Sequence, residues 1–200
     1  MFPDGIHPPH EAFYIESLLW HANAASISID IVEDWLALVR DEDPKCLELP
    51  KPKLFGELQN IVLQAGSISR YFWPARSKGD DGRIHKARAR RLREGLEVSD
   101  SGALADRGLR NALEHFDERL DLFLAQDMTG EFVPDYVDNK RRPVAHSQYI
   151  FKAFYTDDME FVLLDESFFL SPLFQEIRDT HRRLEDCQAS GHRLPYAPDR

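Results

Sequence analysis

Apolar residues recur at intervals of three and four positions between Glu11 and Arg40. This spacing matches the period of an α-helix, about 3.6 residues per turn, and it places the apolar side chains on one helical face. A helix with such a face must bury it against another element. The pattern therefore predicts a long first helix that packs within a larger helical assembly. The residues on this face are Ile15, Leu18, Leu19, Ala22, Ile29, Val32, Leu36 and Val39.

Three further helices are predicted before residue 126. Asp41–Pro52 is acidic and contains prolines, and the second helix follows it over 53–72, ending where Trp73 precedes Pro74. Residues 78–82 are typical of a turn, and the third helix is expected over 83–96. The fourth is expected over 103–125, or from Gly108 onward if that glycine interrupts it.

The remaining part of the chain has a different pattern. Residues 126–146 are rich in Gly, Pro, Asp and Asn and predict a loop. Aromatic and β-branched residues predict strands over 149–155 and 160–164, and Ser171 with Pro172 marks the start of a last helix. The expected fold class is mainly α. A bundle of about four helices over 11–125 carries an appendage over 126–190, made of a loop, a β-hairpin and a helix.

Composition limits the class of protein. At 200 residues, with 42% hydrophobic and 30% charged residues, the chain suits one domain with an appended subdomain. Its start lacks the apolar run of a signal peptide, and no stretch is long and apolar enough to span a membrane. Cys46 and Cys187 have no metal or redox spacing, so we expect reduced thiols, a cytoplasmic protein, no metal site, no cofactor and no membrane partner.

Basic residues gather in one segment of an acidic chain. The net charge of −10 argues against non-specific coating of nucleic acid, yet the segment 83–93 contains no acidic residue. One interpretation is a local contact with RNA. The other is a solvated helix face that the acidic runs neutralise. The candidate RNA-binding residues are Arg83, Lys86, Arg88, Arg90, Arg91 and Arg93.

Arg110, Asn111 and His115 place a guanidinium, an amide and an imidazole on the fourth predicted helix. At about 100° per residue, Asn111 and His115 lie about 40° apart, so the amide could hydrogen-bond the imidazole and fix its tautomer. Arg110 is about 140° from His115 on a straight helix. Both side chains could therefore reach one phosphate if a second copy of the helix faced the first across a two-fold axis.

The spacing of Arg110 and His115, with a polar residue after the arginine, resembles the Arg-x4-His motif of the HEPN superfamily. The helical arrangement over 11–125 is similar to the all-α bundle of that family. The resemblance implies a homodimer whose motifs face one another, and in many members metal-independent endoribonuclease activity. A role as toxin or defence component, with an antitoxin protein as partner, is a further implication. A second match, Arg141–His146, contains Pro143 and lies in the predicted loop, so it is set aside.

Two interpretations of the motif follow. In the first, the protein cuts single-stranded or looped RNA, with His115 transferring a proton and Arg110 neutralising charge on the phosphate, while Asn111 orients the histidine or donates to the phosphate. In the second, the bundle is a non-catalytic dimeric module that binds a nucleotide, RNA or a protein. One open cleft across the dimer, lined by Arg110 and His115 of both chains, would favour the enzyme. Burial of His115 in ion pairs with the neighbouring acids would favour the module. Those acids are Glu114, Asp117, Glu118 and Asp121.

Overall fold

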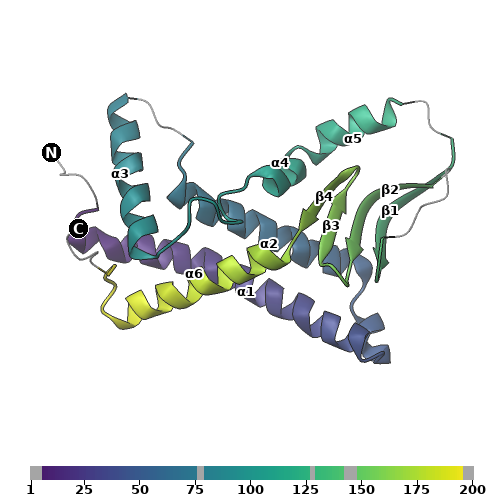
Figure 1. The fold of residues 1–200 in the computed structure, drawn as a ribbon, viewed down its shortest axis with the longest axis horizontal. Coiled ribbons are helices and arrows are strands. Elements are labelled where there is room, and N and C mark those ends of the chain that lie inside the picture. Colours follow the sequence, from purple (N-terminus) through teal and green to yellow (C-terminus); the bar gives the residue numbers. More distant parts are fainter. Residues whose placement is uncertain (1–5, 76–78, 127–128, 142–147, 196–200) are drawn as a thin grey trace. The chain divides into compact units, whose positions relative to one another are not determined.

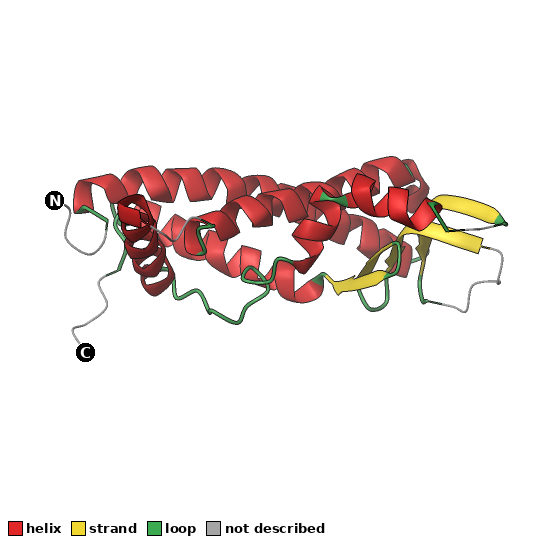
Figure 2. Cartoon of the chain, turned by 90° about the horizontal axis from the view of Figure 1, so that it is seen from above, coloured by secondary structure: helices red, strands yellow, loops and turns green. Residues whose placement is uncertain are grey.

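The computed structural model describes residues 6–75, 79–126, 129–141 and 148–195, and these residues form six α-helices and one four-stranded sheet. Figures 1 and 2 show that helices make up most of the chain, which confirms the mainly α class. The chain divides into two compact units. The first unit comprises Met1–Ile27, Asn60–Asp106 and Leu173–Arg200, and the second comprises Ser28–Gln59 and Arg107–Pro172. No helix in the described ranges is long and apolar enough to cross a bilayer.

Helices α1 (Glu11–Arg40) and α2 (Lys51–Phe72) contribute to both units. The predicted bounds of α1 are confirmed, and α2 begins at Lys51 rather than at residue 53. Pro52 is tolerated there because the first turn of a helix has no internal partner for its N–H groups. The predicted apolar stripe of α1 forms core from Ile15 to Val32, while Leu36 and Val39 are only partly covered.

The first unit also contains α3 (Gly79–Gly95) and most of α6 (Ser171–Ala189). The turn predicted over 78–82 is wrong for Gly79–Gly82, which are helical, and Lys78 lies outside the described residues. Helix α6 starts at the predicted Ser171. Its apolar side chains Leu173, Phe174, Ile177 and Leu184 are buried, as is Leu92 of α3.

A buried carboxylate joins three segments of the first unit. Glu11, at the start of α1, accepts a hydrogen bond from Arg91 of α3 at 3.0 Å and one from the backbone N–H of Leu194 at 3.1 Å. Arg91 also donates to the carbonyl oxygens of Leu194 (3.0 Å) and Pro195 (2.8 Å). The charge of Glu11 is thus compensated by a guanidinium and a backbone donor, which a buried ion requires.

In the second unit, the fourth predicted helix is two helices. Helix α4 (Gly108–Glu114) begins at Gly108, the later of the two starts that the sequence allowed. Helix α5 (Phe116–Leu124) follows after a break at His115. The residues 103–107 are not helical. The apolar stripe of the fourth predicted helix is only partly covered, and Ala112 is the buried residue of α4.

The sheet of the second unit has the order β1-β2-β3-β4, from β1 (Glu131–Asp138), β2 (Gln148–Tyr155), β3 (Glu160–Leu163) and β4 (Glu166–Phe169). The strands β1 and β2 are parallel, and the other neighbours are antiparallel. The predictions for β2 and β3 are confirmed. The loop predicted over 126–146 is wrong for β1. Pro134 suggested a loop, but it lies in an edge strand, where the missing N–H is tolerated.

Aromatic contacts hold α5 and α2 against this sheet. Phe123 of α5 lies 6.0 Å from the ring of Phe151 and 6.4 Å from that of Tyr149. Phe55 of α2 lies 6.0 Å from the ring of Phe161. Arg119 of α5 forms an ion pair with Glu166 of β4 at 2.7 Å. These contacts fix the helix that follows His115.

We expect Glu11→Ala to lower the free energy of unfolding by about 3 kcal/mol or more, because it leaves the Arg91 guanidinium and the Leu194 N–H without their buried acceptor. Denaturant unfolding followed by circular dichroism measures this loss. The matched control is Glu94→Ala, an exposed acid of α3, which should change stability by less than about 0.5 kcal/mol. Equal effects of the two variants would contradict the role of the buried carboxylate.

Candidate functional site

The Arg-Asn-x3-His motif lies at the junction of α4 and α5. His115 is both the C-cap residue of α4 and the N-cap residue of α5. Its backbone angles are φ −113° and ψ 26°. Its N–H still donates to the carbonyl oxygen of Asn111 at 3.1 Å. The helix axis is therefore interrupted at the histidine, and the 140° separation expected for a straight helix does not describe Arg110 and His115.

The three motif side chains have local partners. Arg110 Nη2 lies 3.3 Å from Asn111 Oδ1, and Arg110 Nε lies 3.8 Å from Glu114 Oε2. The expected hydrogen bond between Asn111 and the imidazole is replaced by this contact of Asn111 with Arg110. The imidazole Nδ1 of His115 instead lies 3.3 Å from Glu118 Oε2 on the first turn of α5.

The sequence places Glu118 only among the four acids whose ion pairs with a buried His115 would favour the non-catalytic module. A carboxylate beside Nδ1 favours the tautomer that carries the proton there and leaves Nε2 able to accept one. The spacing of three residues between His115 and Glu118 on a helix would have indicated this pair. The arrangement supplies an oriented imidazole for proton transfer.

The motif residues differ in their access to solvent. The His115 side chain is 56% exposed, whereas that of Arg110 is only 13% exposed. Asn111 is exposed. A ligand could therefore reach the imidazole and the amide directly, while the guanidinium is covered and lies next to a carboxylate. The structure brings Arg110 together with Asn111, and His115 together with Glu118.

Three of the six basic residues of α3 stabilise the first unit. Arg91 holds Glu11, as described above. Arg88 donates to the carbonyl oxygen of Arg70 at 3.2 Å and lies over the ring of Tyr71. Arg93 pairs with Asp100 at 2.8 Å, donates to the carbonyl oxygen of Phe72 and lies over the ring of Trp73. These interactions agree with the interpretation that part of the basic charge is neutralised within the protein.

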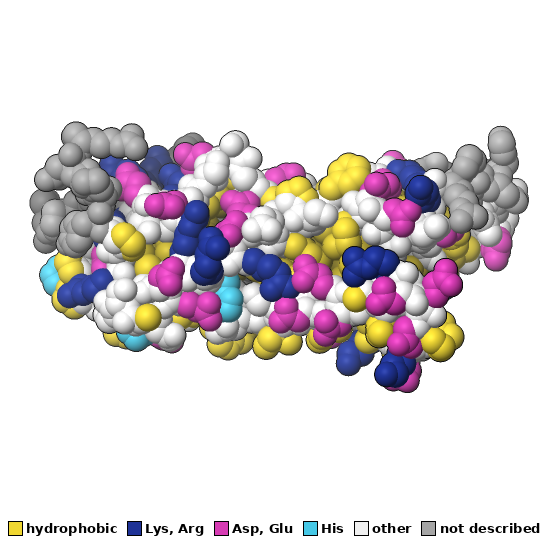
Figure 3. All heavy atoms as spheres, turned by 60° about the horizontal axis from the view of Figure 1, so that its bottom comes forward, with side chains coloured by type: hydrophobic (Ala, Val, Ile, Leu, Met, Phe, Trp, Pro, Cys, Tyr) yellow, Lys and Arg dark blue, Asp and Glu magenta, His cyan; other side chains and the backbone are white. Residues whose placement is uncertain are grey.

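The other three residues, Arg83, Lys86 and Arg90, are exposed. Their spacing of three and four places them on one stripe of α3, which we call the exposed basic stripe. It belongs to the first unit, and the motif belongs to the second. Figure 3 shows one face of the protein on which cationic and acidic side chains are interspersed.

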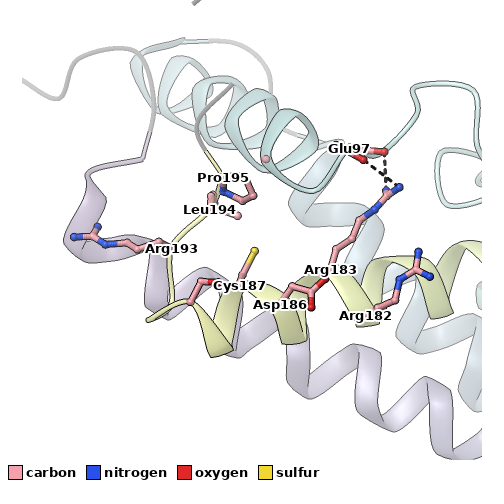
Figure 4. A pocket seen from close by; sticks show the side chains of 10 residues that line it. Glu97, Arg182, Arg183, Asp186, Cys187, Arg193, Leu194 and Pro195 are labelled. Atoms are coloured by element: carbon pink, nitrogen blue, oxygen red, sulfur yellow. Dashed lines mark hydrogen bonds and ion pairs between the residues drawn. The ribbon is translucent and has the colours of Figure 1, made fainter. Parts of the chain in front are cut away.

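A cavity of about 620 Å³ lies in the first unit between the end of α3, the second half of α6 and the segment up to Pro195 (Figure 4). Arg183, Glu97 and Cys187 line it, and Arg183 Nη2 lies 3.4 Å from Glu97 Oε2. Burial raises the pKa of the Cys187 thiol, so it stays protonated at neutral pH and is a poor nucleophile. None of the residues predicted for the site lines this cavity.

Among the described residues, no group of three or more His, Cys, Asp or Glu side chains is placed to hold a metal ion. Arg141, from the second sequence match, pairs with Glu160 at 3.1 Å, and His146 lies outside the described residues. Comparison with models of protein families, with curated proteins and with solved structures gives no match. The resemblance to HEPN proteins thus depends on the motif and on the helical character of the chain.

Replacing Arg88, Arg91 and Arg93 together by alanine should destabilise the protein by several kcal/mol, because Arg91 and Arg93 each lose a charge-assisted hydrogen bond in a partly buried place, worth about 1.5–3 kcal/mol. Replacing Arg83, Lys86 and Arg90 together should change stability by about 0.5 kcal/mol or less per residue, since these residues are exposed. Thermal unfolding of the two triple variants compares them directly. Similar midpoints of thermal unfolding for the two variants would refute the assignment of a structural role to Arg88, Arg91 and Arg93 alone.

Proposed function

We propose that the protein is a metal-independent endoribonuclease of HEPN type that cuts single-stranded or looped RNA. The observation that carries the proposal is the exposed imidazole of His115, whose Nδ1 lies beside Glu118 at a helix junction one turn after Arg110 and Asn111. An imidazole oriented by a carboxylate and open to a ligand is suited to general acid–base catalysis.

In the proposed reaction, the ribose 2′-oxygen attacks the adjacent phosphorus and the bond from phosphorus to the 5′-oxygen breaks. Nε2 of His115 accepts the proton of the 2′-hydroxyl while water protonates the departing 5′-oxygen, or it donates a proton to that oxygen while water takes up the proton of the 2′-hydroxyl. The products are a 2′,3′-cyclic phosphate and a 5′-hydroxyl. Arg110 stabilises the charge that develops on the non-bridging oxygens, and Asn111 donates to the phosphate through its amide.

The covered guanidinium sets a condition on this mechanism. Arg110 must exchange Glu114 for a phosphate, and both acceptors can bind a guanidinium through two oxygens. The acids near the motif oppose the approach of RNA, so the proposal includes an electrostatic contribution from the exposed basic stripe. A homodimer and an antitoxin protein as partner are further parts of the proposal, and both follow from the family resemblance.

The second candidate function is a non-catalytic module that binds a nucleotide, RNA or a protein. The pairing of Arg110 with Glu114 favours it, because a guanidinium that is only 13% exposed and already next to a carboxylate stabilises α4 without any ligand. The two candidates differ in one measurable respect: only the first requires His115 for cleavage of a phosphodiester bond in RNA.

We expect His115→Ala and Arg110→Lys to lower the rate of RNA cleavage by about 10²-fold or more each, since one removes the proton-transfer group and the other removes the bidentate contact. Cleavage of a mixed RNA pool in EDTA, with analysis of the product ends, measures the effect. The control is Asp121→Asn, an exposed acid of α5 placed in no catalytic role, which should retain activity.

Glu118→Gln adds a test of positioning. It should lower the maximal rate while the Michaelis constant changes little, because it removes the carboxylate beside the imidazole and leaves RNA binding intact. Unchanged cleavage by His115→Ala would end the catalytic proposal. Tight RNA binding without cleavage by the unmodified protein would support the module instead.

The exposed basic stripe should contribute to the salt dependence of RNA binding. Each phosphate that it neutralises steepens the slope of log affinity against log salt by about 0.7 for single strands. Changing Arg83, Lys86 and Arg90 to alanine should flatten this slope by up to about 2. Fluorescence anisotropy with a labelled RNA at several salt concentrations measures it. An unchanged slope would remove α3 from the proposed interface.

A further inference from the structure

Helix α1 carries a second apolar stripe, which is exposed and lies on the side of the helix opposite its buried stripe. Phe13, Trp20 and Ile27 are 72%, 65% and 61% exposed, and they recur every seven residues within the first unit. Residues spaced in this way lie on nearly the same line along a helix. A helix that is apolar on two faces has two surfaces to cover, and the core of the first unit covers only one of them.

Small residues alternate with the large ones on this stripe. Ser17 and Ala24 lie between Phe13, Trp20 and Ile27, so that the whole stripe follows the spacing of four and three that is typical of a coiled-coil seam. The Ser17 hydroxyl donates to the carbonyl oxygen of Phe13 at 2.7 Å, which satisfies it within the helix. We call these five residues the α1 seam.

Neighbouring helices hold both flanks of the α1 seam. On one side, Asn23 contacts His181 of α6 at 2.6 Å, and Glu16 accepts hydrogen bonds from Gln188 and His192. On the other side, His21 Nδ1 lies 2.8 Å from Gln64 of α2. The seam is therefore a fixed surface of the first unit rather than the side of a loose helix.

We propose that the α1 seam binds the same seam of a second copy of this chain, with the two helices antiparallel about a two-fold axis near Ala22. This register places Trp20 of one chain against Ala24 of the other and Ile27 against Ser17, so each of these two large side chains meets a small one. A two-fold interface requires such self-complementarity, because the contact of one residue with another occurs twice. A parallel pairing would instead oppose Trp20 to Trp20 and Ala24 to Ala24.

The apolar area is sufficient for the centre of a dimer interface. Since a large aromatic side chain buries about 150–250 Å², the exposed parts of the three large residues amount to roughly 400 Å² per chain. That is about half of the roughly 800 Å² that each partner contributes to a standard interface, in which a polar rim supplies the remainder.

Charge does not oppose this pairing. Among the flanking side chains named above, Glu16 is the charged one. Its carboxylate accepts hydrogen bonds from Gln188 and His192, and these hydrogen bonds lower its pKa. In the proposed register, Asn23 of one chain lies near His21 of the other, and the central positions bring no two like charges together. The proposal does not depend on RNA cleavage by the motif.

The experiment exchanges Trp20 and Ala24, the large and the small residue that the proposed register pairs. The oligomeric mass of the full chain is measured by sedimentation equilibrium for the unmodified protein, for Trp20→Ala, for Ala24→Trp and for the double variant. We expect a dimer for the unmodified protein at tens of micromolar, a loss of affinity of at least about 10-fold for each single variant, and recovery in the double variant. Leu122→Ala, which removes an exposed side chain of α5 in the second unit, is the matched control and should remain dimeric.

Circular dichroism of every variant checks that the monomer is folded, as the exposure of Trp20 leads us to expect. A monomeric unmodified protein would overturn the proposal and would assign the seam to a different partner. A dimer that survives both single variants would place the interface elsewhere and would also overturn it. Loss in the single variants without recovery in the double variant would refute the antiparallel register. RNA cleavage is measured separately, so failure of the dimer and failure of the nuclease proposal are distinguishable.

Discussion

The first unit depends on compensation of one buried charge. Glu11 lies at the first residue of α1, and its carboxylate binds Arg91 of α3 and the backbone of Leu194. Removal of either partner would leave an ion in a site from which water is excluded, which costs more than the loss of an exposed ion pair. The same requirement explains why half of the basic helix serves structure: Arg88, Arg91 and Arg93 satisfy carbonyl and carboxylate oxygens at its contacts.

The period of the apolar residues predicted the elements whose faces are continuous. The bounds of α1 and the start of α6 were predictable because one period and clear end signals mark each of them. Strand β1 was missed because Pro134 and the nearby glycine have the composition of a loop, and only its edge position in the sheet makes the proline acceptable. Strand β4 is only four residues long and carries no pattern of its own.

The candidate site was predictable in its residues but not in its geometry. Arg110, Asn111 and His115 were identified from their spacing on an assumed straight helix. The break at His115 depends on tertiary contacts of the following helix, such as the rings of Phe123 and Phe151 and the ion pair of Arg119 with Glu166, and no local pattern encodes them. The pairing of Glu118 with His115 was predictable from their spacing of three residues, whereas the break before α5 was not.

The net charge of −10 is a weaker argument against an RNA partner than it first suggests. At physiological ionic strength, charges beyond about 8 Å from a phosphate are largely screened, so the local arrangement of cations decides the contact. Arg83, Lys86 and Arg90 span about 10 Å along one stripe of α3, given a rise of about 1.5 Å per residue. Acids elsewhere reduce long-range attraction and so slow association, but they leave the interaction at this stripe nearly unchanged. The proposed RNA contact is therefore a weak one at a defined place on α3, not a coating of the nucleic acid.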